Sequence, residues 1–379
     1  MPDVHAKLSA SGAYRWMACT PSAELESQFE DRESSYAKEG TLAHSVAELK
    51  LRLANDELTK AQYDNKRKKL GEIPTDMDDY TDAYVDTVIE RLNEARHYCP
   101  DATLMIEQRL NFSKYVPDGF GTGDAVIVSD HSIEVLDLKY GKGVQVFAEE
   151  NPQARLYATG AYLEFGMLYD APTVRSTVVQ PRLDHISVEE LTTTELLKWA
   201  EEVVKPKALL AIKGEGEFHA GTHCKFCKAA QVCRARAEEA LNLARHEFQA
   251  PPILTDEEVE EILPQLDNLI AWAGDIKEYA YRKALDGTGW EGFKLVEGKS
   301  NRKYTDEAEV VNRLRAAGLS DDVIYDKKII SITALEKTLG GSKFNDLLGD
   351  LVVKPRGNPT LVSAKDRRAE ISSAELDFS

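Results

Sequence analysis

The sequence predicts a mixed α/β fold in which helices flank a β-sheet. Short runs rich in β-branched and aliphatic residues are typical of strands, and they occur at 103–112, 122–129, 132–140 and 173–182. A helical pattern at 151–168 separates the last two of these runs, and two more helical patterns, 38–54 and 76–99, precede them. Strands and helices in this order are typical of an α/β core.

The first helical segment, 38–54, has one apolar face. Leu42, Val46, Leu49 and Leu53 recur at helical spacing, so this face is expected to be buried. His44 and Glu48 lie four residues apart and therefore share a second face. The segment 76–99 is also amphipathic, and its acidic residues concentrate near its start, where the helix dipole favours them.

The two central strands are predicted to form a hairpin, because only Asp130 and His131 separate them. The helix at 151–168 opens with Asn151-Pro152, a common start signal. A further helix is expected at 187–212, leading into a cysteine-rich run.

With 379 residues, the chain is long enough for two units. We expect one domain at 1–250 and a smaller C-terminal α+β segment at 251–379, with Pro251 and Pro252 in the linker and an irregular tail from Lys354.

The net charge of −18 argues against a surface that binds DNA non-specifically, although a local groove with a few basic residues stays compatible with it. The sequence has no run of about 18 apolar residues and no apolar signal core at its start. We therefore expect a cytoplasmic protein without a membrane partner.

Two acids and a lysine are predicted to meet on the hairpin. Asp124 begins one strand, while Asp137 and Lys139 lie two residues apart at the end of the next and so share one side. Such carboxylates can hold Mg²⁺ or Mn²⁺ for phosphodiester hydrolysis, and the amine can stabilise developing charge. Taken alone, an Asp and a Lys at this spacing are more typical of a solvated strand pair.

Three motifs together resemble the PD-(D/E)XK nuclease superfamily. "GTGDAVIV" and "IEVLDLKYGKG" are similar to its catalytic core, "EGTLAHSVAE" resembles the histidine helix of its RecB-like branch, and "QARLYATGAY" resembles the Gln-Tyr motif of that branch. The resemblance implies a restriction-endonuclease-like mixed β-sheet. It implies catalytic roles for Asp124, Asp137, Lys139, Gln153 and Tyr157, and metal ligation by His44, Asp124, Asp137 and the backbone carbonyl of Leu138. Glu48 and Glu107 are candidates for acids just outside the ligand set.

The run "HCKFCKAAQVC" contains Cys224, Cys227 and Cys233, which is one ligand short of a four-coordinate site. His223, Cys99 and Cys19 are the candidates for the fourth ligand. Spacing alone leaves an iron-sulfur cluster and zinc equally open.

The same nuclease branch includes proteins with an iron-sulfur cluster, among them the AddB nuclease domain and the CRISPR adaptation nucleases. In these, one cysteine precedes the core and three follow it, so the resemblance implies a 4Fe-4S cluster on Cys19, Cys224, Cys227 and Cys233, with Zn²⁺ at the same cysteines as the alternative. Such a cluster would close a loop of roughly 200 residues and stabilise the fold by several kcal/mol. Cys99 is then expected to be a buried free thiol.

The basic residues Lys66, Arg67, Lys68 and Lys69 are candidates for a DNA entrance, although a solvated face is the commoner role of such a stretch. Arg15, beside Cys19, is a further candidate for DNA contact, with packing as the alternative.

The whole chain is similar to a phage and prophage family of unassigned function. We therefore expect a metal-dependent DNA exonuclease of phage type that acts on DNA ends or single strands during recombination or replication in the bacterial host, with a single-strand annealing protein as a partner. The alternative is a non-cleaving DNA-binding or assembly subunit that retains the metal cluster. A zinc-ribbon transcription factor is excluded, because only one Cys-x2-Cys pair is present.

Overall fold

The structure is a computed structural model that describes residues 6–29, 35–169, 171–244, 256–296, 306–325, 332, 335, 339, 341–348 and 351–352. The chain divides into two compact units, Met1–Lys283 and Ala284–Ser379. The first unit contains every residue expected to take part in the chemistry. The domain boundary expected at residue 250 lies outside the described residues and stays a prediction.

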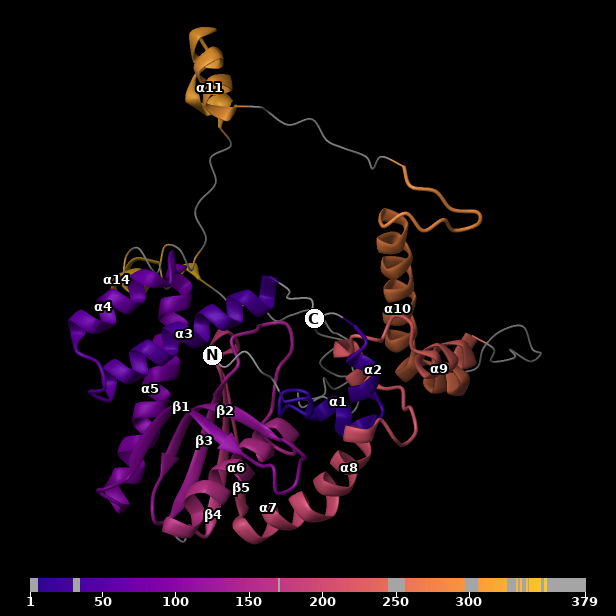
Figure 1. The fold of residues 1–379 in the computed structure, drawn as a ribbon. Coiled ribbons are helices and arrows are strands. Elements are labelled where there is room, and N and C mark those ends of the chain that lie inside the picture. The colour runs from indigo at the N-terminus through magenta and orange to yellow at the C-terminus, as the bar shows by residue number, and fades with distance from the viewer. Residues whose placement is uncertain are drawn as a thin grey trace. The chain divides into compact units, whose positions relative to one another are not determined.

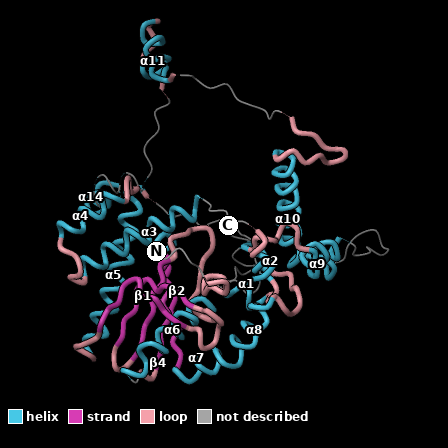
Figure 2. The backbone as a smooth tube through the Cα atoms, viewed as in Figure 1, coloured by secondary structure: helices cyan, strands magenta, loops and turns pink. Residues whose placement is uncertain are grey.

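A five-stranded mixed sheet forms the centre of the first unit (Figures 1 and 2). Its strands are β1 (Thr103–Asn111), β2 (Phe120–Val128), β3 (Ser132–Leu138), β4 (Thr173–Gln180) and β5 (His185–Thr192), and they lie in this order across the sheet. Neighbouring strands are antiparallel except β3 and β4, which are parallel. The expected hairpin is confirmed, since β2 and β3 pair with Ala125 opposite Leu136.

Helices cover both faces of the sheet, so the fold is α/β, as predicted. On one face α6 (Pro152–Tyr169) crosses from β3 to β4 and packs on β1 to β4, and α7 (Thr193–Trp199) and α8 (Lys205–Lys213) extend this layer. The other face carries α3 (Ser35–Ala54) and α5 (Thr75–Tyr98). Side-chain alternation explains the two cores: Val126 and Val128 pack on the α6 side, whereas Ala125 and Ile127 pack on the α3 and α5 side.

The helix expected at 187–212 is partly wrong. Residues up to Thr192 form the edge strand β5, which pairs with β4 from Thr173–Thr192 to Gln180–His185. The helix begins only afterwards, where the Thr192 side chain accepts a hydrogen bond from the Glu195 N–H and Glu195 reaches back to Thr192. Pairing with a neighbouring strand thus overrides the local helical pattern in this segment.

The N-terminal helices α1 (Ala13–Ala18) and α2 (Ser22–Glu26) pack against α8, although nearly 200 residues separate them in sequence (Figure 1). Farther along the chain lie α4 (Lys60–Lys69), α9 (Arg234–Ala244), α10 (Asp256–Leu285), α11 (Glu307–Ala316), α12 (Asp321–Ile324) and α14 (Gly341–Leu348). The described part of residues 284–379 contains helices and no strand, so the β structure expected there has no counterpart among the described residues. Within the described helices, none combines the length and apolar character needed to cross a membrane.

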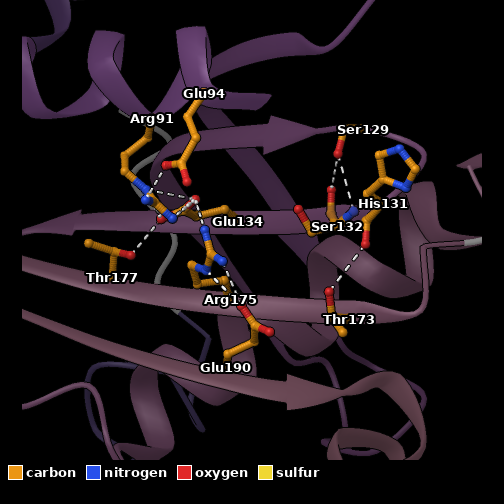
Figure 3. Close-up of polar contacts among 10 residues, drawn as sticks. All are labelled: Arg91, Glu94, Ser129, His131, Ser132, Glu134, Thr173, Arg175, Thr177 and Glu190. Carbon is orange, nitrogen blue, oxygen red and sulfur yellow. Dashed lines mark hydrogen bonds and ion pairs between the residues drawn. The ribbon is translucent and has the colours of Figure 1, made fainter. Parts of the chain in front are cut away.

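A buried carboxylate ties α5 to the sheet (Figure 3). Glu134 on β3 is 4% exposed, and the guanidinium of Arg91 on α5 donates to both of its oxygens at 3.1 to 3.2 Å. The hydroxyl of Thr177 on β4 donates to Oε1 at 2.6 Å, and Arg175 lies 3.5 Å from Oε2. Burial raises the pKa of Glu134, while Thr177 and Arg91 oppose this rise. Because the charge is compensated by several partners, it can stay inside the fold.

Candidate active site

Asp124 and His44 meet between β2 and α3. His44 Nδ1 lies 3.0 Å from Asp124 Oδ1, and the N–H of Leu138 donates to Asp124 Oδ2 at 2.7 Å. The second contact places the Asp124 carboxylate directly at the end of β3. The structure therefore brings together the histidine helix and both strands of the hairpin.

The pairing of His44 with Asp124 changes the pKa of both groups. Burial alone lowers the pKa of His44, but the Asp124 carboxylate outweighs burial and raises the pKa to about 9. Conversely, burial alone raises the pKa of Asp124, but His44 and the Leu138 N–H hold it below its ordinary value. In the metal-free protein at neutral pH the two groups therefore form an ion pair.

Asp137 and Lys139 form a second pair next to the first. Asp137 is 6% exposed, and its Oδ2 lies 2.8 Å from Lys139 Nζ. Apart from this ion pair, Oδ2 accepts no hydrogen bond from the described residues. Burial raises the pKa of Asp137, Lys139 opposes the rise, and the nearby charge of Asp124 adds to it. The Asp137 carboxylate is thus a buried anion whose charge a cation can balance.

The Gln-Tyr helix α6 positions Lys139. Lys139 Nζ donates to Gln153 Oε1 at 2.9 Å, and Gln153 Nε2 donates to the Tyr157 hydroxyl at 3.4 Å. The Tyr157 ring leaves no room for a side chain at Gly121, because a Cβ there would lie 2.5 Å from Tyr157 Cε1. Gly121 thus allows the ring to approach β2 closely.

Glu107 lies closer to the centre than the sequence suggested. It is on β1 opposite Asp124, between the register pairs Ile106–Ala125 and Gln108–Gly123. Its φ of 52° is left-handed, which is unusual for a glutamate and typical of strained functional positions. Burial, followed by the charges of Asp124 and Glu48, raises its pKa to about 7. The strand pattern alone gave no sign that Glu107 points toward Asp124.

The residues present fit a divalent cation. Ligand atoms of His44, Glu107 and Asp124 all lie within 4.8 Å of one another. Asp137 is outside this compact group and contributes its buried Oδ2 beside it. Glu48 is instead paired with Arg52, since its Oε1 accepts a hydrogen bond from Arg52 Nε at 2.8 Å. Carboxylate oxygens with one imidazole suit Mg²⁺ or Mn²⁺.

The compact group of His44, Glu107 and Asp124 lines a cleft of about 620 Å³, whereas Asp137 and Lys139 are not among its lining residues. His44 and Glu48 come from α3, Glu107 from β1, Asp124 from β2 and Tyr157 from α6. A cleft of this volume is typical of a ligand site, and the convergence of several titratable groups in it is typical of catalytic centres.

Comparison with known families matches residues 5–369 to the family described as "Protein of unknown function (DUF2800)". The chain belongs to the DUF2800 family. The match spans nearly all of the chain, from the N-terminal helices to the C-terminal tail.

Among solved structures, the chain matches one described as "Crystal structure of SSO0001", with 14% sequence identity, over 51% of this chain and 85% of the other. The TM-score of this match is 0.23.

The cysteine run of this DUF2800 protein lies against its N-terminal segment. The Tyr14 hydroxyl lies 2.6 Å from Thr222 Oγ1, and Glu26 Oε1 accepts from the Lys228 N–H at 2.9 Å. A hydrogen bond with Cys19 raises the pKa of His223. The structure therefore brings Cys19 to the edge of the run.

The thiols do not converge as a compact group. All five cysteines are free, and no three of Cys19, Cys224, Cys227 and Cys233 lie within 4.8 Å of one another. Burial raises the pKa of Cys227 to about 12. Cys99 is buried at the end of α5, where its thiol donates to Asp101 Oδ1 at 3.0 Å.

The basic residues proposed to contact DNA differ in whether they are exposed or paired within the fold. Lys66, Lys68 and Lys69 on α4 are exposed. Arg67 is held by Asp78, with Nη1 donating to Oδ1 at 2.9 Å, and Arg15 Nε lies 3.2 Å from Glu26 Oε1. Both guanidinium groups are thus engaged within the fold, which favours the packing alternative for Arg15 and leaves Arg67 neither on a solvated face nor free to contact DNA.

Proposed function

We propose that this protein is a metal-dependent deoxyribonuclease of the PD-(D/E)XK type, an exonuclease that hydrolyses phosphodiester bonds at DNA ends or in single strands. One observation carries the proposal: His44, Glu107 and Asp124 converge in a single cleft, with the Asp137–Lys139 pair adjoining them. A cation site beside a positioned amine is suited to phosphodiester hydrolysis, because the cation can activate water and the amine can stabilise charge on the phosphate.

His44, Glu107, Asp124 and Asp137 would hold Mg²⁺ or Mn²⁺, with the Leu138 carbonyl as a further oxygen ligand. When bound, the cation would lower the pKa of a water molecule and neutralise charge on the phosphate. The buried Asp137 carboxylate beside Lys139 supports this assignment.

Lys139 would donate a hydrogen bond from Nζ to a phosphate oxygen and stabilise the charge that develops there. Gln153 holds this amine through Oε1, and Tyr157 holds Gln153 in turn. The amine is thus oriented before substrate arrives, which reduces the entropy lost in the transition state.

We further propose that Cys19, Cys224, Cys227 and Cys233 hold a 4Fe-4S cluster that joins the N-terminal helices to the end of the nuclease core. The contacts of α1 and α2 with the cysteine run support it. In zinc sites four thiolates surround one ion, whereas in a cluster each binds a different iron, which requires wider spacing. The finding that no three of these thiols lie within 4.8 Å of one another is compatible with such a cluster.

As a phage-type nuclease, the protein would act in DNA recombination or replication in the cytoplasm of a bacterial host, where an annealing protein is the natural recipient of its single-stranded product.

The test is cleavage of end-labelled single-stranded and duplex DNA with Mg²⁺ or Mn²⁺. Lys139→Ala should lower the rate by about 100-fold or more while leaving folding intact. Lys213→Ala, which removes an exposed lysine at the end of α8, is the matched control and should cleave normally. If the wild type with its full metal content leaves all of these DNAs intact, the protein is instead a non-cleaving binding or assembly subunit.

A further inference from the structure

Arg109 and Phe120 form a stacked pair inside the candidate cleft, and no sequence motif marks either residue. The Arg109 guanidinium carbon lies 4.1 Å from the centre of the Phe120 ring. Both residues line the cleft that contains His44, Glu107 and Asp124.

The strand geometry places this pair on a line with the carboxylates. Phe120, Thr122 and Asp124 alternate along β2 and therefore share one side of it, and Arg109 is the register partner of Thr122 on β1. Two residues of strand advance by about 7 Å, so Arg109 lies about 7 Å and Phe120 about 13 Å from Asp124 along the sheet. A substrate that leaves the metal site in this direction meets the guanidinium and then the ring.

Arg109 also differs from most described arginines of the first unit in its ion pairing. Arg15, Arg52 and Arg67 are ion-paired with glutamate or aspartate. Arg109 is exposed and forms no ion pair with a described carboxylate. In a chain of net charge −18, a cation left free in the cleft is available for an anionic ligand.

Arg109 also lines a second hollow of about 550 Å³. The other residues that line it are Gln108, Asn111, Ser113, Lys114, Leu163 and the acidic Glu164. Lys114 is exposed, and its Nζ lies 5.2 Å from the centre of the Tyr115 ring. Hydroxyl, amide and ammonium groups along this path are typical partners of a sugar-phosphate backbone.

We propose that the Arg109–Phe120 pair is a binding site for the nucleotide next to the scissile phosphate, and that it selects single-stranded DNA. This inference rests on the proposed function, since it assigns a DNA path to that cleft. The outer face of the guanidinium can stack on an unpaired base while its N–H groups reach the flanking phosphate. In a duplex the base faces are already stacked on one another, so this platform offers no gain there.

Binding measured without cleavage tests the inference. Fluorescence anisotropy with a labelled single-stranded oligonucleotide in EDTA reports affinity, and a duplex of the same sequence provides the comparison. Arg109→Ala should weaken single-strand binding about tenfold or more, given the usual contribution of base stacking. Arg109→Lys keeps the charge but loses the planar face, so it should recover only part of the affinity.

Phe120→Leu should weaken binding in the same direction, because it keeps the burial and removes the aromatic face. Arg313→Ala, which removes an exposed guanidinium from α11, is the matched charge control and should bind like the wild type. Thermal unfolding of each variant shows whether it is folded.

Unchanged affinity in both Arg109→Ala and Phe120→Leu would overturn the inference, as would equal or tighter binding of the duplex. The cleavage assay separates this result from the proposed function. If the wild type cleaves DNA and Arg109→Ala cleaves with the same KM, the inference is wrong and the nuclease proposal stands. If the wild type cleaves no DNA but its binding of single strands depends on Arg109, the pair is a single-strand binding site and the nuclease proposal is wrong.

Discussion

Replacing Glu107 by Gln should stabilise the metal-free protein at pH 8. Burial and the charges of Asp124 and Glu48 raise the pKa of Glu107 from 4.5 to about 7, so its ionised form is disfavoured in the folded state. At 1.36 kcal/mol for each pKa unit, the penalty at pH 8 is at most about 3 kcal/mol. Because solvent partly screens the group, we expect the variant to gain about 1 to 2 kcal/mol.

The sign of the pH dependence follows from linkage. Glu107 binds its proton more tightly in the folded state than in the unfolded state, so the penalty is complete above pH 7. It decreases as the pH falls from 7 and disappears below 4.5, where the carboxyl is protonated in both states. The advantage of the variant should therefore shrink toward zero as the pH approaches 4.5.

Urea unfolding in EDTA at several pH values measures this difference. Glu90→Gln, which neutralises an exposed glutamate on α5, is the control and should change stability little at any pH. Adding Mn²⁺ should favour the wild type, because the variant has lost a candidate ligand. A Glu107→Gln protein that is no more stable than the wild type in EDTA at pH 8 would refute the reasoning.

Three other changes test the structure at separate places. Gly121→Ala should lower cleavage about tenfold or more and cost about 1 to 3 kcal/mol of stability, because the new Cβ displaces Tyr157 and with it the support of the catalytic amine, as kinetics on end-labelled DNA and urea unfolding would measure. Cys19→Ala should remove iron from the purified protein and lower its melting temperature, as metal analysis and calorimetry would show. Glu134→Ala should cost about 1.5 to 3 kcal/mol in urea unfolding, since it removes the buried carboxylate that accepts hydrogen bonds from Arg91 and Thr177.

Each of these has an outcome that would contradict it. Wild-type kinetics in Gly121→Ala would mean that the Tyr157 ring can move without consequence. Iron retained by Cys19→Ala would make another residue the ligand, whereas Cys99→Ala should keep its iron in either case. A loss below about 1 kcal/mol in Glu134→Ala would show that Arg91 finds compensation in Glu94, its other acidic partner.

The candidate site was predictable where its residues are linked by local spacing. Asp137 and Lys139 share one side of a strand and Gln153 and Tyr157 one side of a helix because the repeats of strand and helix fix these relations within a few residues. The hairpin places Asp124 beside them, because its short connection makes the second strand run back antiparallel to the first. His44 could be assigned only by resemblance, because no local rule connects it to residues 80 positions away.

The sequence by itself determined the α/β class, the hairpin and the side of each element on which polar groups lie, because these follow from interactions between residues close in the chain. Only the tertiary structure decided that residues 185–192 form an edge strand, that Glu107 faces Asp124 and His44, and that Asp78 engages Arg67. Strand pairing, packing and ion pairing between distant segments set these three outcomes, and such contacts exist only once the chain has folded.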